Sequence, residues 1–121
     1  MSVNRNYYVI AGYDLTEYMT DNAREWIYET DEGENLICYH RPGNIQLFDD
    51  LDRDRYLYVG YILAGGDEYD FPTTKFDIVQ VEQMMLNVGR VVDRLQEVGV
   101  IDCDVSTGGL IYEMIAFEED T

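Results

Sequence analysis

The chain has 121 residues, of which 25 are Asp or Glu and 8 are Lys or Arg, so its formal net charge is −17. This length predicts a single domain over residues 1–121, and a hydrophobic fraction of 46% with 13% aromatics excludes an intrinsically disordered chain. The charge excludes direct binding to DNA, RNA or an anionic membrane, because Lys and Arg side chains hold those partners. It favours a basic partner, or it serves solubility alone.

Three features predict a soluble, cytoplasmic protein. Residues 1–15 lack the basic segment and apolar stretch of a signal peptide, and no apolar run is long enough to span a membrane. The two cysteines, Cys38 and Cys103, are too few for a disulfide scaffold. Their apolar neighbours predict buried free thiols, as in a reducing compartment.

The first third of the chain predicts a strand, a short helix and a turn. Only Met1–Asn4 and the acidic tail 118–121 are expected to be loose ends. Alternating apolar residues over 7–15 predict a strand. A short helix is expected over residues 20–26, with Thr20 as its N-cap, and the composition of residues 30–34 is typical of a turn.

The middle of the chain predicts a hairpin followed by the clearest strand. Residues 36–40 and 44–48 favour two strands, joined by a turn in which Pro42 fixes φ and Gly43 accepts a positive φ. An acidic loop follows, and residues 56–64 then alternate regularly between two faces, as a strand does.

The last third predicts one long helix and a final strand. Asp77 as N-cap, with Gln80 three residues later, predicts the start of the helix, and Gly99 suits the left-handed residue after its end. Its expected core-facing stripe is Ile78, Val81, Met85, Val88, Val92 and Leu95, widened by Met84, Val91 and Val98. With a strand over residues 110–117, the predicted fold class is α+β, a mostly antiparallel sheet of about five strands packed against one main C-terminal helix.

Several predicted strands carry apolar or aromatic residues on both faces. One helix covers only one face of a sheet, so the other face needs a second cover. Either the segment 16–30 or a second copy of the chain, in a homodimer, would supply it.

Common catalytic and metal-binding motifs do not fit this sequence. Residues 50–54 start like an EF-hand loop, but Arg55 and Tyr61 stand where that loop needs Gly and Glu. Cys38 and His40 offer too few ligands for a closed zinc site, and no nucleophile motif accompanies His40. No glycine-rich phosphate loop occurs. We therefore expect a protein that is not an enzyme and binds no cofactor or metal ion.

Acidic residues gather in two loops, at opposite ends of the predicted strand 56–64. On an extended segment, carboxylates two residues apart lie about 6.6 Å from each other, comparable to successive phosphates of a nucleic acid. Such carboxylates can occupy Arg and Lys sites built for phosphates, and neighbouring tyrosines can stack on Arg. The predicted partner-binding residues are Asp49, Asp50, Asp52, Asp54, Tyr56, Tyr58, Asp67, Glu68, Tyr69 and Asp70.

The segments NIQLFDD (44–50), YLYVGYILA (56–64), GDEYD (66–70) and TKFDI (74–78) resemble small acidic proteins of bacteriophages and prophages of Gram-positive bacteria. The resemblance covers about a third of the chain. Such proteins include anti-CRISPR inhibitors and other DNA mimics, which block nucleic-acid enzymes by occupying their binding clefts. The resemblance implies the cytoplasm of a bacterial host cell as the location, and it implies no catalytic residue.

These observations lead to two expected functions. The first is a non-enzymatic, anti-CRISPR-like inhibitor whose acidic surface binds the basic cleft of a nucleic-acid-handling protein such as a CRISPR effector. The alternative is a phage accessory or counter-defence protein that binds a small ligand at a homodimer interface, as the two-sided apolar strands and the many tyrosines suggest. A hydrolase that depends on His40 is a third, weaker interpretation.

Overall fold

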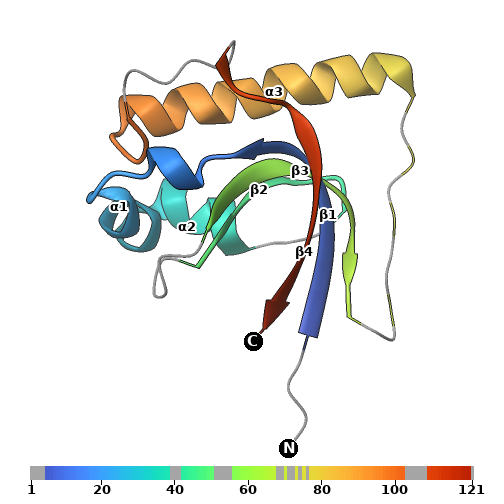
Figure 1. Cartoon of the computed structure of the whole chain (residues 1–121), viewed down its shortest axis with the longest axis horizontal. Coiled ribbons are helices and arrows are strands. Elements are labelled where there is room, and N and C mark those ends of the chain that lie inside the picture. Colours follow the sequence, from blue (N-terminus) through green and yellow to red (C-terminus); the bar gives the residue numbers. More distant parts are fainter. Residues whose placement is uncertain are drawn as a thin grey trace, which may run out of the picture.

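The computed structural model describes residues 5–38, 42–50, 56–67, 70, 73, 75, 77–102 and 109–120. In chain order they form β1 (Arg5–Asp14), the short 3-10 helix η1 (Thr16–Tyr18), α1 (Ala23–Glu29), α2 (Asp31–Cys38), β2 (Ile45–Asp49), β3 (Leu57–Gly66), α3 (Ile78–Glu97) and β4 (Glu113–Asp120). Figure 1 shows α3 lying across an arched sheet, with α1 and α2 at one end of the arch.

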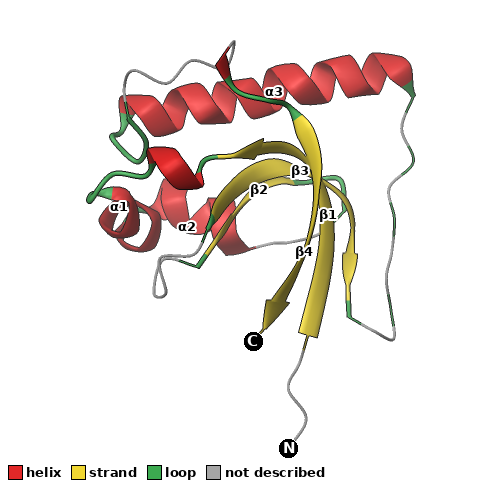
Figure 2. Cartoon of the chain, viewed as in Figure 1, coloured by secondary structure: helices red, strands yellow, loops and turns green. Residues whose placement is uncertain are grey.

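The sheet has the strand order β2-β3-β1-β4, and every neighbouring pair is antiparallel (Figure 2). The predicted α+β class with an antiparallel sheet is therefore confirmed, as are the strands predicted over residues 7–15 and 56–64, which are β1 and β3. The described residues contain four strands rather than five, because residues 36–38 of the predicted strand 36–40 belong to α2.

The helices cover the convex face of the sheet. The buried core between them and the strands comprises Tyr13, Leu15, Ala23, Ile27, Leu47, Leu57, Val59, Val88, Val92, Leu95, Val100 and Ile101. Because Leu15 and Ile27 belong to this cluster, the segment 16–30 lies on the same face as α3. Of the two alternatives for covering the opposite face, the one that uses the segment 16–30 is therefore wrong. None of the helices in the described ranges is long and apolar enough to cross a membrane.

The concave face is covered by the curvature of the sheet itself. In a flat sheet the outer strands β2 and β4 would lie roughly 14 Å apart, from about 4.8 Å between neighbouring strands. Phe48 of β2 and Phe117 of β4 nevertheless have ring centroids 5.0 Å apart, and Tyr8 of β1 lies 4.8 Å from Phe48. The sheet is thus rolled until aromatic side chains of its two edge strands touch, which leaves Phe48 only 1% exposed.

Two facing glycines allow this curvature. Gly12 of β1 pairs in register with Gly60 of β3. A Cβ atom on Gly12 would lie 1.9 Å from the carbonyl oxygen of Val59, and one on Gly60 would lie 3.0 Å from the side chain of Ile10. Any side chain at Gly12 would therefore push the backbones of β1 and β3 apart.

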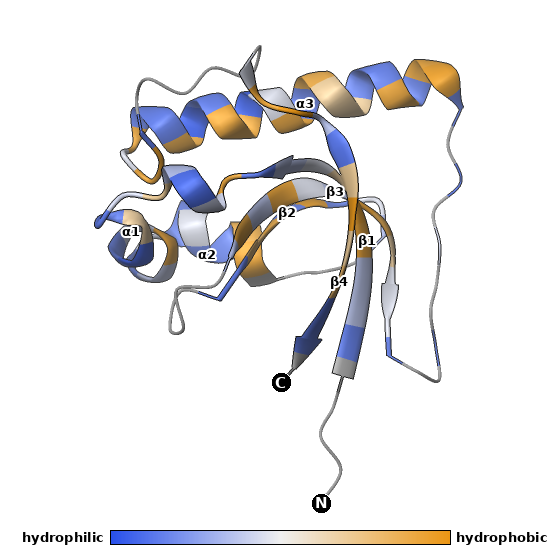
Figure 3. Cartoon of the chain, in the orientation of Figure 1, coloured by the Kyte–Doolittle hydropathy of each residue, from blue (hydrophilic) through white to orange (hydrophobic). Residues whose placement is uncertain are grey.

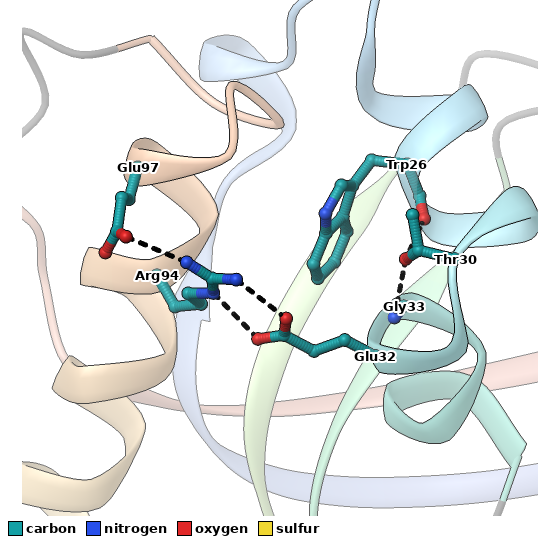
Figure 4. A network of polar contacts seen from close by, with 6 residues as sticks. All are labelled: Trp26, Thr30, Glu32, Gly33, Arg94 and Glu97. Atoms are coloured by element: carbon teal, nitrogen blue, oxygen red, sulfur yellow. Dashed lines mark hydrogen bonds and ion pairs between the residues drawn. The ribbon is translucent and has the colours of Figure 1, made fainter.

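Residues 31–38 are helical where the sequence predicted a turn over 30–34 and a strand over 36–40. The Thr30 hydroxyl accepts a hydrogen bond from the Gly33 amide at 3.0 Å, as an N-cap side chain does, and donates one to the Trp26 carbonyl oxygen (Figure 4). Three acidic residues in the first turn of α2 suit the positive end of the helix dipole. These signals favour a helix, and they outweigh the short alternation over residues 36–40 from which a strand was predicted.

A bidentate ion pair joins α2 to α3 (Figure 4). Arg94 donates from Nε to Oε1 of Glu32 at 2.8 Å and from Nη2 to Oε2 at 2.9 Å, and its Nη1 donates to Glu97 at 2.8 Å. The hydrogen bond from Arg94 holds the pKa of Glu32 below its ordinary value. Both side chains of the pair are nearly half exposed, so it fixes the relative orientation of the helices more than it stabilises the fold.

The long helix α3 is capped as predicted, but its apolar stripe is only partly buried. Asp77 accepts from the Gln80 amide at 2.9 Å, and the Gln80 side chain accepts from the Asp77 amide at 2.7 Å. Gly99 follows the helix with a φ of 84°. Ile78 and Met85 were predicted to face the core, but they are exposed, because the N-terminal end of α3 extends beyond the strands (Figures 1 and 3).

Two further boundaries differ from the prediction. The expected short helix is α1, but Thr20 is not its N-cap, since the Thr20 hydroxyl donates instead to the carbonyl oxygens of Gly99 and Val100. The last strand is Glu113–Asp120 rather than 110–117. Residues 118–120 of the predicted loose tail therefore pair with β1.

Candidate functional site

The concave face carries three aromatic side chains that are partly exposed. The rings of Tyr56 and Tyr58 stack with centroids 4.7 Å apart and an interplanar angle of 12°. Phe117 of β4 lies 5.1 Å from the Tyr58 ring and 5.8 Å from the Tyr56 ring. Tyr8 and Phe48 are buried in the same cluster. We call Tyr56, Tyr58 and Phe117 the aromatic row.

One end of the aromatic row carries three carboxylates. Asp49 ends β2, Asp50 follows it, and Glu119 lies on β4. Burial and then the negative charges of Asp49 and Asp50 raise the pKa of Glu119. Burial and then the charges of the same three carboxylates raise the pKa of Tyr56. The Tyr28 hydroxyl of α1 donates a hydrogen bond to Asp49, which holds this carboxylate against the helical layer.

The other end of the aromatic row carries a second group of carboxylates. Asp14, the last residue of β1, pairs in register with Tyr58. Burial and then the charges of Asp14 and Glu113 raise the pKa of Tyr58. Together with Glu17, these two carboxylates line a cavity of about 250 Å³. The remaining lining residues are Tyr18, Gly109, Leu110 and Ile111.

Glu113 and Glu119 lie on the concave face, whereas Asp49 alternates with Phe48 on β2 and points to the helical side, where Tyr28 donates to it. Glu113 and Glu119 are six residues apart on β4, which at ~3.3 Å per residue places them roughly 20 Å apart. Their even spacing puts both on the face of β4 that also carries Phe117. We call the aromatic row and its flanking carboxylates (Asp49, Asp50 and Glu119 at one end; Asp14, Glu17 and Glu113 at the other) the acidic-aromatic surface.

The structure brings some of the predicted partner-binding residues together and separates others. Asp49, Asp50, Tyr56 and Tyr58 all belong to the acidic-aromatic surface. Asp67 and Asp70 lie beyond the opposite end of β3, where Asp67 Oδ1 accepts from the Asp70 amide at 2.8 Å. The other predicted residues lie outside the described ranges; they are Asp52, Asp54, Glu68 and Tyr69.

Sequence reasoning missed the carboxylates that β1 and β4 contribute. Glu119 was assigned to a loose tail because it lies in a run of acidic residues. The alternation of Glu113, Ile115, Phe117 and Glu119 along one face of a strand was the signal that could have found it. Asp14 carries no such local signal, since only the pairing of β1 with β3 places it beside Tyr58.

Comparisons with known proteins do not assign this surface. No protein-family model matches the chain, and no curated protein or solved structure is significantly similar to it. The resemblance to acidic phage proteins therefore stays a prediction. Within the described ranges, no group of three or more His, Cys, Asp or Glu side chains is arranged to hold a metal ion.

The raised pKa of Glu119 leads to a stability prediction. Because burial and two neighbouring carboxylates disfavour its charged form in the folded state, the charged Glu119 destabilises the fold above its folded pKa. This destabilisation disappears as the pH falls below the ordinary value for a glutamate, where folded and unfolded chains are both protonated. Glu119→Gln is therefore expected to raise the melting temperature at pH 7 but not at pH 3.

Thermal unfolding followed by circular dichroism across this pH range checks the expectation. Glu118→Gln removes the same charge from the neighbouring exposed position on the opposite face of β4 and serves as the control. Equal stabilisation by both variants, or a gain for Glu119→Gln that does not change with pH, would show that the local environment of Glu119 is not the cause.

Proposed function

We propose that the chain is a non-enzymatic, anti-CRISPR-like inhibitor whose acidic-aromatic surface occupies the basic cleft of a nucleic-acid-handling protein in place of nucleic acid. The observation that carries this proposal is the stacked pair Tyr56 and Tyr58, flanked at its two ends by two groups of three carboxylates. The net charge of −17 supports the same kind of partner.

Each part of the surface suits a basic side chain. Carboxylates accept paired hydrogen bonds from guanidinium groups as phosphates do, and tyrosine faces attract Arg through cation–π contacts. The cavity of about 250 Å³ combines the carboxylates of Asp14, Glu17 and Glu113 with apolar walls. It can therefore hold the aliphatic stem of a Lys or Arg while the carboxylates bind the charged head.

The orientation of Asp14 supports this role. Its Oδ1 accepts hydrogen bonds from the Thr16 amide at 3.0 Å and from the Thr16 hydroxyl at 2.5 Å. The carboxylate is therefore fixed before a partner arrives, which lowers the entropy lost on binding.

The separation of the two carboxylate groups supports a macromolecular partner. At roughly 20 Å they are too far apart for one side chain and suit a cleft that holds several phosphates in a row. Tyr8, Phe48 and Phe117 fill the concave face by packing on each other, with centroid separations of 4.8 to 5.6 Å. This packing favours a contact surface over the deep small-ligand pocket of the alternative hypothesis.

Binding through charges of this kind is expected to depend strongly on salt. Proteins that the tethered chain retains from a bacterial lysate at 50 mM NaCl should be enriched in nucleic-acid-handling proteins. Their affinity should fall at least about tenfold by 300 mM NaCl, because salt screens exposed charge pairs. Mass spectrometry identifies the retained proteins, and titration of each purified partner measures the effect. Retention of the same proteins with equal affinity at both salt concentrations would contradict the proposal.

A further inference from the structure

A second surface lies on α3 and is apolar. Ile78, Val79 and Leu86 are 79%, 74% and 60% exposed. With Met85 they occupy the N-terminal half of the helix, which extends beyond the strands (Figure 3). At 3.6 residues per turn, positions 78, 79, 82, 85, 86 and 89 fall within a sector roughly 120° wide, beside the buried stripe. Large apolar side chains gathered in one exposed sector mark an interaction surface.

The same segment carries little net charge, unlike the rest of the chain. Residues 78–93 contain two acidic residues, Glu82 and Asp93, and one basic residue, Arg90, so their net charge is −1, whereas the whole chain has a net charge of −17. Within the described part of the chain, neither Glu82 nor Arg90 takes part in an ion pair or hydrogen bond. A second copy of this chain would be repelled strongly by most of the acidic surface, but only weakly by this segment.

We propose that α3 pairs with α3 of a second copy, antiparallel across a two-fold axis at Leu86. Glu82 and Arg90 lie four residues on either side of Leu86, about 6 Å along the helix at 1.5 Å per residue. Antiparallel pairing therefore sets Glu82 of each copy beside Arg90 of the other, and the symmetry forms this ion pair twice. Leu86 is buried between the helices, and Val79 of each copy lies beside Asp93 of the other.

The dimer leaves the acidic-aromatic surface accessible. The helix α3 covers the convex face of the sheet, and the aromatic row lies with Glu113 and Glu119 on the concave face. The contact does not depend on the proposed function, and a dimer presents two copies of the acidic-aromatic surface.

The proposed contact is small, which sets its expected strength. Residues 78–93 span about 24 Å of a helix roughly 10 Å wide. The area of this contact is therefore well below the roughly 800 Å² that a stable interface buries on each partner. We expect a dissociation constant in the micromolar range. At 0.15 M salt the Debye length is about 8 Å, so the repulsion between the more distant acidic surfaces is largely screened.

Sedimentation equilibrium of the full chain, from 5 to 500 µM in 0.15 M NaCl, tests the pairing. E82R and R90E are each expected to weaken the dimer at least tenfold, because each sets like charges opposite one another. The double variant E82R/R90E should restore the dissociation constant to within about threefold of the parent. E82R makes the chain less negative and R90E makes it more negative, so an effect of total charge alone would shift the two single variants in opposite directions.

Two results would overturn the proposal. One is a parent chain that stays monomeric at 500 µM. The other is a failed charge exchange: either E82R dimerises as tightly as the parent, or the double variant dimerises as weakly as the two single variants. L86N, at an exposed position, is expected to weaken the dimer at least tenfold while its circular dichroism stays that of the parent.

Discussion

Substituting Ala for Gly12 is expected to prevent folding or to lower the melting temperature by about 10 °C or more. The added Cβ would lie 1.9 Å from the Val59 carbonyl oxygen and 2.5 Å from Gly60 Cα, and both are backbone atoms that cannot rotate away. Separating β1 from β3 at this point breaks the centre of the sheet and opens the concave cluster behind it. We estimate a loss of at least about 3 kcal/mol, a large part of the 5–15 kcal/mol that is typical of a domain.

Gly109→Ala is the matched control. A Cβ there would meet no atom within 4 Å, so this substitution should change the melting temperature by only a few degrees. Thermal unfolding of both variants, followed by circular dichroism and tyrosine fluorescence, measures the difference. A Gly12→Ala chain that melts within a few degrees of the parent would mean that β1 and β3 do not approach each other as closely as the structure shows.

Neutralising the acidic loop after β2 is expected to weaken partner binding about 100-fold. The variant replaces four aspartates with asparagine: Asp49, Asp50, Asp52 and Asp54. Each removed charge weakens a charge-assisted hydrogen bond to the partner. If each loss costs only about 0.7 kcal/mol of binding free energy, the four losses together weaken binding about 100-fold. The fold should survive, because the change lowers the repulsion that Asp49 and Asp50 exert on Glu119.

A second variant separates the site from the total charge. It removes four exposed charges from the helical layer instead: Asp21→Asn, Glu25→Gln, Glu29→Gln and Glu34→Gln. This control should bind the partner within about fivefold of the parent, since only long-range attraction is lost. Equal weakening by both variants would mean that the partner responds to net charge rather than to the acidic-aromatic surface.

Local signals predicted the elements that depend on neighbouring residues. Asp77 and Gln80 specify the start of α3 through a capping box that needs only four residues, and Gly99 specifies its end. Regular alternation likewise predicted β3. The α2 helix was missed because its N-cap, Thr30, was interpreted as part of a turn, a structure that favours the same residue types.

The curvature of the sheet could not be predicted in this way. It depends on Gly12 meeting Gly60, which are 48 residues apart in the sequence, and on Phe48 reaching Phe117 across the two edges of the sheet. Two-sided apolar strands correctly indicated that the second face is covered. They did not indicate that the sheet covers this face by rolling.

The residues of the candidate site were likewise predicted only where they are close in sequence. Asp49, Asp50, Tyr56 and Tyr58 were predicted because they are close in sequence. Asp14, Glu113 and Glu119 were not, because they reach the aromatic row only through strand pairing. The stripe on α3 was taken as core throughout, since helical periodicity does not show how far a helix extends beyond its sheet.

Competition with nucleic acid shows whether the chain and nucleic acid occupy the same cleft of the partner. One of the retained partner proteins is purified first. Its affinity for this chain is then measured by fluorescence anisotropy at 100 mM NaCl, in the presence of rising concentrations of the nucleic acid that the partner binds. If the chain mimics nucleic acid, the two bind mutually exclusively: saturating nucleic acid displaces the chain, and the four-asparagine variant fails to displace the nucleic acid. A ternary complex of chain, partner and nucleic acid, with neither affinity changed by the other ligand, would rule out this mimicry.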